Sequence, residues 1–273
     1  KHRRRQRQMC IRDSLNIHES KFIKKISNRR IGIGCDQVLM IRDTVKSNTY
    51  KVTMYNSDGS ETGACGNGTR CVADYLMKRD NLNSLTIESI NGNLLCTRDD
   101  NVVTVNMGKP KFDWKDIPLA SKQNTQKVLL DEFEAFCLSM GNPHAVIFMQ
   151  NLDELESLNL NVVGPRLEKN VNFPEFANIE FVCVLEDNTI RMRVWERGVG
   201  VTKACGSGAC ATLVAAFKKN KSSKSNKIIL DGGDLFVEWL NNGTVTLSGE
   251  TEKVYEGIIL SLIHISEPTR QLQ

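Results

Sequence analysis

One short pattern, Cys-Gly-x-Gly followed by an apolar stretch, occurs twice in this chain. The first copy lies in "TGACGNGTRCVADYL" (residues 62–76) and the second in "TKACGSGACATL" (residues 202–213). In both copies the residues after the glycines, 71–77 and 209–217, are apolar nearly all round, as in a helix that a sheet encloses. A repeated supersecondary unit of this kind predicts a chain built from two similar half-domains that face each other.

Most of the remaining sequence alternates apolar and polar residues over short runs, which is typical of half-buried strands. Turns rich in Asn, Asp and Gly separate these runs and predict hairpins at 90–94, 99–101, 231–234 and 241–244. Residues 131–140 and 152–159 have the composition of short surface helices. We therefore expect an α+β fold of two pseudo-symmetric half-domains, each a mostly antiparallel β-sheet or barrel around a central helix, with the active site in the cleft between them.

The two ends of the chain differ in origin from the rest, on our interpretation. "MCIRDS" (9–14) and "LSLIHI" (260–265) can be encoded by opposite strands of one inverted repeat, and that repeat resembles a transposon end used to prepare sequencing libraries. We therefore treat residues 1–14 and 260–273 as adapter-derived and leave them out of the fold argument. The expected domains are an N-terminal half-domain over 15–108, joined by a returning strand over 251–259, and a C-terminal half-domain over 109–250.

The formal net charge of +4 comes from the ends of the chain. Residues 1–14 contain six basic residues and one acidic residue, and 260–273 contain one of each, so the rest is nearly neutral. The arm "KHRRRQRQ" therefore gives little reason to expect nucleic acid or an anionic membrane as a partner. Because we find no apolar run of spanning length and no signal peptide, we expect a soluble protein that is not exported.

The nine cysteines of the chain predict neither disulfides nor a metal site. Without a secretion signal, the thiols of such a chain are expected to be reduced. A structural zinc site needs closely spaced ligand pairs such as Cys-x-x-Cys. Here Cys65 and Cys71 are six residues apart, Cys205 and Cys210 are five apart, and histidines lie near neither pair.

A cysteine and glycines at the start of a helix make a site for an anion. The first turn leaves amide N–H groups unpaired at the positive end of the helix dipole, and glycines let a carboxylate approach them. The same position stabilises a thiolate, so we expect a lowered cysteine pKa. A single such turn could be a cap with an incidental cysteine. Two copies that face each other would place Cys65 and Cys205 on opposite sides of one small carboxylate substrate, which suits the inversion of a stereocentre.

The chain resembles the diaminopimelate epimerase family, whose members interconvert the LL and meso forms of diaminopimelate without a cofactor. The resemblance lies in six blocks that follow the order of the family along nearly all of the central chain. The blocks are "RIGIGCDQVLMI" (30–41), "YNSDGSETGACGNGTRC" (55–71), "MGNPHAVIF" (140–148), "VNF" (171–173), "WERGVGVTKACGSGAC" (195–210) and "YEGIIL" (255–260).

The resemblance implies a role for each matching residue. Two cysteines would exchange protons with the substrate, namely Cys65 and Cys205. Four residues would supply amide donors to the carboxylate at the reacting carbon: Gly66, Asn67, Gly206 and Ser207. Two would hold the reacting amino group: His144 and Glu196. Five would bind the distal amino acid end: Gln37, Asn56, Asn142, Asn172 and Arg197.

Spacing alone leaves simpler roles open for several of these residues. Asn142 and Asn172 could form turns, His144 could be a buried structural histidine, and Arg197 could make a surface ion pair. Two other functions also stay open. The chain could be a proline racemase or hydroxyproline epimerase, although the small cyclic substrates of these enzymes have no second amino acid end for the polar residues to bind. It could also be a catalytically dead amino-acid-binding protein.

The resemblance further implies an enzyme of lysine and peptidoglycan precursor synthesis. It would act on a small molecule, need neither pyridoxal phosphate nor a metal, form a homodimer, and work in the cytoplasm of a bacterium or in a plastid. The family begins with a strand that bears a Gly-Asn-Asp-Phe-like motif, and nothing here matches that motif. We therefore expect one sheet edge to be unpaired and one substrate contact to be missing.

Overall fold

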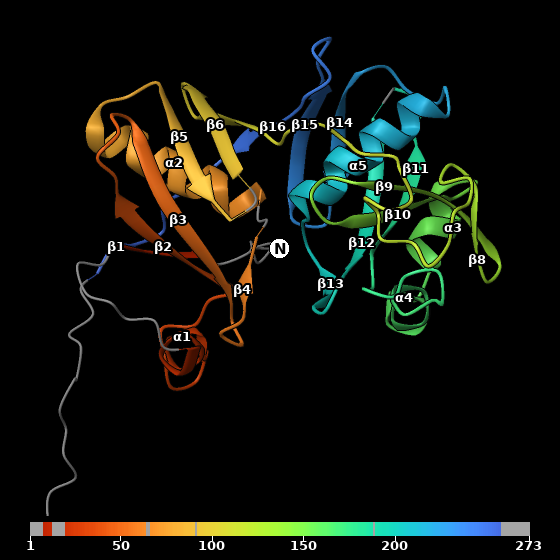
Figure 1. Cartoon of the computed structure of the whole chain (residues 1–273), viewed down its shortest axis with the longest axis horizontal. Coiled ribbons are helices and arrows are strands. Elements are labelled where there is room, and N and C mark those ends of the chain that lie inside the picture. The colour runs from red at the N-terminus through yellow and green to blue at the C-terminus, as the bar shows by residue number, and fades with distance from the viewer. Residues whose placement is uncertain (1–7, 13–19, 64–65, 91, 188, 258–273) are drawn as a thin grey trace, which may run out of the picture.

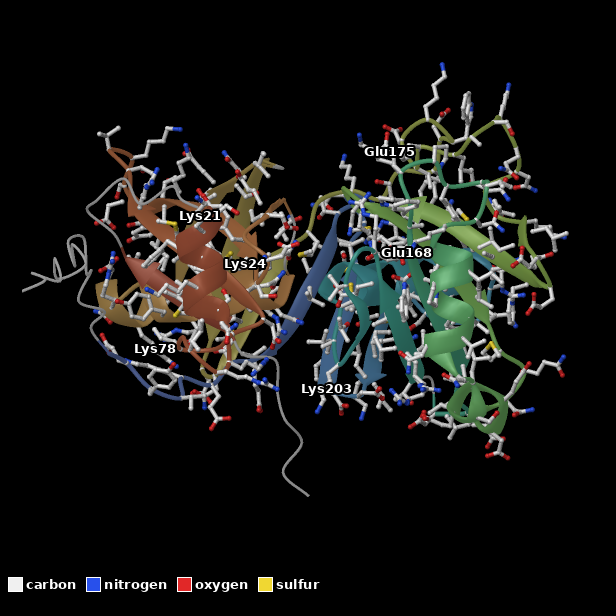
Figure 2. The ribbon with its side chains drawn as sticks, turned by 90° about the horizontal axis from the view of Figure 1, so that it is seen from below. Lys21, Lys24, Lys78, Glu168, Glu175 and Lys203 are labelled. Atoms are coloured by element: carbon white, nitrogen blue, oxygen red, sulfur yellow. The ribbon has the colours of Figure 1, made fainter. Side chains whose placement is uncertain are left out.

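The computed structural model describes residues 8–12, 20–63, 66–90, 92–187 and 189–257. The N-terminal half of the chain forms one lobe and the C-terminal half forms a second lobe beside it (Figure 1). Seen from below, Lys21 and Lys24 lie on the first lobe, and Glu168 and Glu175 lie on the second (Figure 2). This arrangement confirms the predicted α+β fold with two similar halves.

Helix α2 forms the centre of the first lobe. Its residues Val72, Ala73 and Leu76 have no exposed surface, because strands wrap around the helix. They pack with side chains of the strands in one hydrophobic cluster. The elements of this lobe are β1 (Gln8–Arg12), α1 (Ser20–Ser27), β2 (Gln37–Asp43), β3 (Thr49–Asn56), β4 (Glu61–Thr62), α2 (Gly66–Asp80), β5 (Ser84–Ser89), β6 (Gly92–Asp99) and β7 (Val102–Asn106).

Helix α5 occupies the matching place in the second lobe, and residues 206–216 of it are buried. A second hydrophobic cluster fills the other side of the sheet, beneath α3 and α4. The elements of this lobe are β8 (Val128–Leu130), β9 (Phe133–Ser139), β10 (Pro143–Phe148), α3 (Leu152–Ser157), α4 (Leu160–Glu168), β11 (Asn178–Val184), β12 (Ile190–Glu196), β13 (Gly200–Thr202), α5 (Gly206–Lys218), β14 (Ser225–Leu230), β15 (Gly233–Trp239) and β16 (Val245–Glu250).

Five strands of each lobe share one set of pairings. In the first lobe β1 pairs with β2 in parallel, β2 with β3 antiparallel, β3 with β4 antiparallel and β3 with β5 in parallel. In the second lobe β10, β11, β12, β13 and β14 repeat these pairings in the same order and directions. Helices α2 and α5 are the crossover helices at equivalent positions, so the duplication predicted from the sequence is confirmed.

The strand that joins the two lobes is β16. One edge of β16 pairs with β15 of the second lobe, and its other edge pairs with β7 of the first, so that one sheet continues through both lobes. The returning strand that we expected over 251–259 is not formed over 251–257, which have no regular structure; 258 and 259 lie outside the described residues. The apolar alternation of β16 stops at Glu250.

The helix that we predicted over 131–140 is wrong, because most of this segment forms strand β9. Phe136 and Leu138 point into the hydrophobic cluster around α5, whereas Ala135 and Cys137 point into the cluster beneath α3 and α4. A strand that is buried on both faces lacks the alternation of apolar and polar residues that marks a half-buried strand. The helix predicted over 152–159 is present as α3.

The sheet edge that we expected to be unpaired is occupied. Strand β1, from within the segment that we interpret as adapter-derived, pairs in parallel with β2, from Gln8↔Gln37 to Arg12↔Ile41. This is the place that β10 holds in the second lobe. Residues 1–7, 13–19 and 258–273 lie outside the described residues. Across the described part of the chain, no helix is long and apolar enough to cross a membrane.

Candidate functional site

The starts of helices α2 and α5 meet where the lobes join. Helix α2 begins at Gly66 and α5 begins at Gly206. A Cβ atom built on Gly206 would lie 3.1 Å from the Gly66 Cα atom and 2.8 Å from Leu247 Cδ2, so a side chain has no room there. The amino ends of both helices, which carry the positive ends of the helix dipoles, are therefore in direct contact.

A second contact between the lobes runs through Asn67. Its side-chain Nδ2 donates to the carbonyl oxygen of Ala204 at 3.1 Å. Arg70, which is buried in α2, donates to Asn67 Oδ1 at 2.7 Å and to the carbonyl oxygen of Glu250 at 3.3 Å. The side chain of Asn67 thus binds Ala204, the residue before Cys205, while the backbone of Asn67 is part of the first turn of α2.

Cys205 is the N-cap residue of α5 and is 5% exposed. Its sulfur accepts a hydrogen bond from the Gly208 N–H at 3.4 Å and lies 3.6 Å from Ser207 Oγ. Burial raises the pKa of the Cys205 thiol well above its ordinary value, and the carboxylates of Glu196 and Glu180 raise it further. The hydrogen bonds with Ser207 and Gly208 lower this pKa, but by less than burial and the two carboxylates raise it. The lowered pKa that we expected from the helix start is therefore wrong for Cys205 in this structure.

Cys65, the other predicted proton-exchanging residue, lies outside the described residues together with Ala64. Its role stays a prediction, supported by the position of Gly66, which follows it in the chain.

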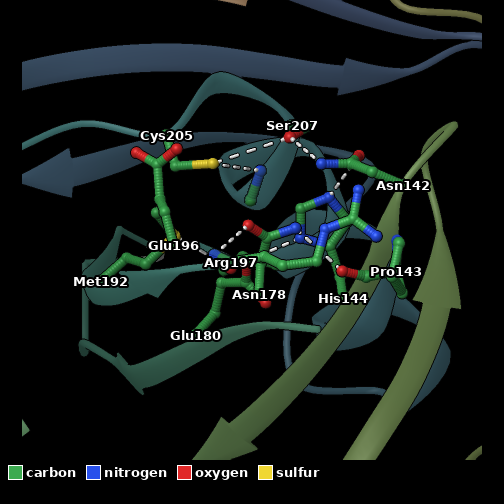
Figure 3. A network of polar contacts seen from close by, with 12 residues as sticks. Asn142, Pro143, His144, Asn178, Glu180, Met192, Glu196, Arg197, Cys205 and Ser207 are labelled. Atoms are coloured by element: carbon green, nitrogen blue, oxygen red, sulfur yellow. Dashed lines mark hydrogen bonds and ion pairs between the residues drawn. The ribbon is translucent and has the colours of Figure 1, made fainter. Parts of the chain in front are cut away.

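A chain of polar contacts leads from β11 to Cys205 (Figure 3). His144 is fully buried; its Nδ1 lies 2.7 Å from Glu180 Oε1 and its Nε2 lies 2.9 Å from Asn142 Oδ1. Asn142 Nδ2 lies 3.4 Å from Ser207 Oγ. The structure therefore brings three predicted residues together beside Cys205. Within the described ranges, no three His, Cys, Asp or Glu side chains are grouped so as to hold a metal ion.

Glu196 is the last residue of β12 and faces Cys205 (Figure 3). Thr202 Oγ1 donates to its Oε1 in a short hydrogen bond. Burial raises the pKa of Glu196 to about 7, and the nearby Glu180 carboxylate also raises it, whereas the bond from Thr202 lowers it. A carboxyl group with this pKa can be charged or neutral near neutral pH, beside the sulfur of Cys205.

Replacing Glu196 by glutamine should stabilise the protein at alkaline pH and leave it unchanged at acid pH. The pKa of Glu196 is about 7 in the folded protein against 4.5 ordinarily, so the folded state binds the carboxyl proton more tightly. The contribution of this proton to the free energy of unfolding is complete below pH 4.5 and is lost as the pH rises to about 7. Above this window the variant should have a free energy of unfolding about 3 kcal/mol higher than the wild type.

Urea unfolding at several pH values measures this difference, which the prediction requires to grow between pH 4.5 and 7. A difference that is independent of pH would contradict it. Glu132→Gln is a control of opposite sign, because Arg166 holds the pKa of the Glu132 carboxyl below its ordinary value.

The turn after β12 presents Arg197. Its backbone N–H donates to Asn178 Oδ1 at 3.0 Å, and the Asn178 side chain donates to the carbonyl oxygen of Pro143 at 2.9 Å. The guanidinium of Arg197 is exposed and donates to the carbonyl oxygen of Glu175 at 3.2 Å. Glu168 supports the same turn by accepting from the Gly198 N–H at 2.7 Å. Arg197 thus lies on a turn that hydrogen bonds to Asn178 and Glu168 hold in place (Figure 3).

Two predicted residues lie together on the first lobe. Gln37 in β2 and Asn56 in β3 are opposite each other in the strand register, and Gln37 Nε2 donates to Asn56 Oδ1 at 3.4 Å. The structure therefore places these two residues in contact, and their binding role stays a prediction.

Asn172 is placed differently from the other predicted residues. It lies in the loop after α4, where its Nδ2 donates to the carbonyl oxygen of Leu129 at 3.2 Å and its Oδ1 accepts from Gln123 Nε2 at 3.0 Å. Among the contacts that the structure describes, none joins Asn172 to His144 or Cys205. Its binding role stays a prediction.

Sequence reasoning missed Asn178 and Glu180, which lie on β11 within the contacts around His144. Both are buried, and Glu180 has no exposed surface. The available signal was a charged residue within the apolar run "NIEFVCV" (178–184), because a buried carboxylate is rare unless it has a partner.

Comparison with known proteins places this chain in a family. The sequence profile described as "Diaminopimelate epimerase" matches residues 11–113 and 136–254. A diaminopimelate epimerase of Rhodospirillum centenum is 42% identical over 239 residues, which cover 86% of this chain and 81% of that protein. A diaminopimelate epimerase of Acetivibrio thermocellus is 40% identical over 261 residues, which cover 91% of each.

Solved structures share the fold at much lower identity. A putative phenazine biosynthesis PhzC/PhzF protein of Clostridium difficile has a TM-score of 0.64 at 15% identity, covering 92% of this chain and 91% of that one. A probable proline racemase of Agrobacterium radiobacter K84 has a TM-score of 0.64 at 13% identity, covering 91% and 83%. These neighbours establish the architecture, and the sequence relatives establish the family. The chain belongs to the diaminopimelate epimerase family.

Proposed function

We propose that this chain interconverts LL- and meso-diaminopimelate by proton transfer between two cysteines and the substrate Cα atom. Family membership supports the reaction. The observation that carries the mechanism is the contact between Gly66 and Gly206, because each glycine directly follows one of the two cysteines in the sequence. A substrate carboxylate beside this contact would meet the amino ends of both helices at once.

In each direction one cysteine starts as a thiolate and the other as a thiol. The thiolate removes the Cα proton, and the electron pair left behind is delocalised into the carboxylate, which the N–H groups of the two helix starts hold. The opposite thiol then gives its proton to the other face of the same carbon. The number of protons is unchanged, and the two cysteines have exchanged states. The raised pKa of Cys205 suits the thiol of this pair.

The remaining residues would orient the substrate. Glu196 faces Cys205, and His144 is connected to Cys205 through Asn142 and Ser207, which supports a role for both in holding the reacting amino group (Figure 3). The exposed guanidinium of Arg197 can receive the distal carboxylate through two parallel hydrogen bonds. Gln37 and Asn56 would contact the substrate from the first lobe.

Family membership also supports a proposal for the pathway and the cellular location of the reaction. We propose that the enzyme acts in lysine and peptidoglycan precursor synthesis in the cytoplasm of a bacterium or in a plastid. A homodimer is proposed on the resemblance alone. The relatives named above are bacterial proteins, which supports the first location.

The reduced protein incubated with LL-diaminopimelate in deuterium oxide should form the meso isomer and incorporate deuterium at Cα. Proton NMR follows both changes, since the Cα signal disappears as deuterium enters. L-Proline and trans-4-hydroxy-L-proline serve as controls for the related racemases. Exchange with these compounds and not with diaminopimelate would contradict the proposal, and a protein that only binds amino acids would leave every Cα–H bond intact.

A further inference from the structure

Glu180 is a buried charge to which neither the sequence nor the proposed mechanism assigns a role. It lies in the middle of β11 between Ile179 and Phe181, and none of the three has exposed surface. Removing a carboxylate from water is costly unless the protein supplies a partner and hydrogen bonds. The groups in contact with Glu180 should therefore show why a carboxylate occupies this position.

The contacts of Glu180 point to the site. Its Oε1 lies 2.7 Å from His144 Nδ1. A Cβ atom built on Gly208 would lie 2.8 Å from the same oxygen, so the carboxylate lies against the first turn of α5, where only glycine leaves it room. The second oxygen, Oε2, is buried and has no hydrogen-bond partner within the described residues. His144 is thus the side chain that Glu180 holds directly.

His144 in turn begins the chain of contacts that ends at the reacting sulfur. Its Nε2 lies 2.9 Å from Asn142 Oδ1, Asn142 Nδ2 lies 3.4 Å from Ser207 Oγ, and Ser207 Oγ lies 3.6 Å from Cys205 Sγ. Each member has a limited choice of donors and acceptors, so the proton arrangement at one end restricts the arrangement at the other.

We propose that Glu180 is a positioning residue of the epimerase: its carboxylate keeps a proton on His144 Nδ1, so that only Nε2 can change its proton, and the chain through Asn142 and Ser207 links that change to Cys205. This inference rests on the proposed function, because it describes how the same site is prepared for proton transfer.

Two arrangements of the chain contain the same number of protons. In the first, His144 Nε2–H donates to Asn142 Oδ1, Asn142 Nδ2 donates to Ser207, and the Ser207 hydroxyl donates to a Cys205 thiolate. In the second, the Asn142 amide is turned over and donates to an unprotonated Nε2, its oxygen accepts from Ser207, and the Cys205 thiol donates to Ser207 Oγ. The proton that His144 holds in the first arrangement is on the sulfur in the second.

The charge of Glu180 also acts on groups of the neighbouring elements. It raises the pKa of Cys205 on α5 and of Glu196 on β12, and it adds to the effect of burial on the pKa of Cys137 on β9. His144 on β10 is the group that it contacts. Glu180 therefore disfavours a second negative charge nearby, and the ring of His144 lies between its carboxylate and the contacts that lead to Cys205.

Glu180→Gln and Glu180→Met test the inference. Glutamine keeps the shape and removes the charge, and methionine also removes the acceptor. With isotope-labelled histidine, proton–nitrogen correlation spectra report which ring nitrogen bears a proton, and the chain has only four histidines. In the wild type Nδ1 of His144 should be protonated. In both variants that preference should weaken, and kcat/KM for diaminopimelate should fall about 10- to 100-fold.

Asp74→Asn is the matched control. Asp74 is also a buried carboxylate, with an ion pair to Lys78 at 2.8 Å on the far part of α2, so its neutralisation should leave both the His144 spectrum and kcat/KM unchanged. If methionine prevents folding, the glutamine variant decides by itself.

An unprotonated Nδ1 in the wild type, or wild-type kcat/KM in a folded Glu180→Gln, would overturn the inference. The proposed function fails separately: a wild type that does not act on diaminopimelate refutes that reaction, whereas the spectrum of His144 still decides whether Glu180 fixes the Nδ1 proton.

Discussion

Replacing Cys205 by alanine should lower kcat for epimerisation by about 10³-fold or more, because alanine can neither remove nor return a proton. A mechanism with two bases also predicts that the variant treats the two isomers differently. With Cys65 still present, one isomer of diaminopimelate should continue to exchange its Cα proton for deuterium, with retention of configuration. The other isomer should not exchange. NMR in deuterium oxide and chiral chromatography of the product measure the two effects.

Cys210→Ala is the matched control for this experiment. Cys210 lies on the same helix and is fully buried in the cluster around α5, so its truncation should affect stability more than rate. Cys205→Ala itself removes an N-cap contact to Gly208, which costs about 1 kcal/mol. Unfolding curves therefore accompany the rates. Epimerisation at the wild-type rate in a folded Cys205→Ala would rule out this cysteine as a proton donor or acceptor.

Replacing Gly206 by alanine should impair both stability and catalysis. The new Cβ atom would lie 3.1 Å from Gly66 Cα and 2.8 Å from Leu247 Cδ2, so the starts of α2 and α5 must separate. Overpacking of this kind costs about 1–3 kcal/mol. A shift of the helix starts also moves the donors away from the substrate carboxylate, and we expect kcat/KM to fall about 10²-fold.

Gly66→Ala should act in the same direction, since its Cβ would lie 3.3 Å from Gly206 Cα. Gly257→Ala serves as the control, because within the described residues no atom outside its chain neighbours lies within 4 Å of the added group. Urea unfolding and steady-state rates separate the two effects. Wild-type rates in Gly206→Ala would show that the contact between the helix starts is not needed for catalysis.

Local patterns predicted much of the fold. The glycine-rich turns and the apolar stretches after them mark α2 and α5, and the Asn- and Gly-rich segments mark the hairpin turns, because both depend on residues close together in the chain. Segment 131–140 was mispredicted since its burial on two faces comes from α5 on one side and α3 and α4 on the other. The end of the linking strand at Glu250 likewise depends on which edges are available for pairing.

Some features of the candidate site also follow from the sequence, and others depend on the tertiary structure. The sequence by itself determined the duplication, the two Cys-Gly turns and the set of polar residues that resemble the family, since these are properties of residue type and spacing. Only the tertiary structure decided that Gly66 touches Gly206, that Glu180 lies against His144 and α5, and that burial raises the pKa of Cys205. Contact and desolvation depend on the atoms that the fold brings around a group, and neighbours along the chain do not specify them.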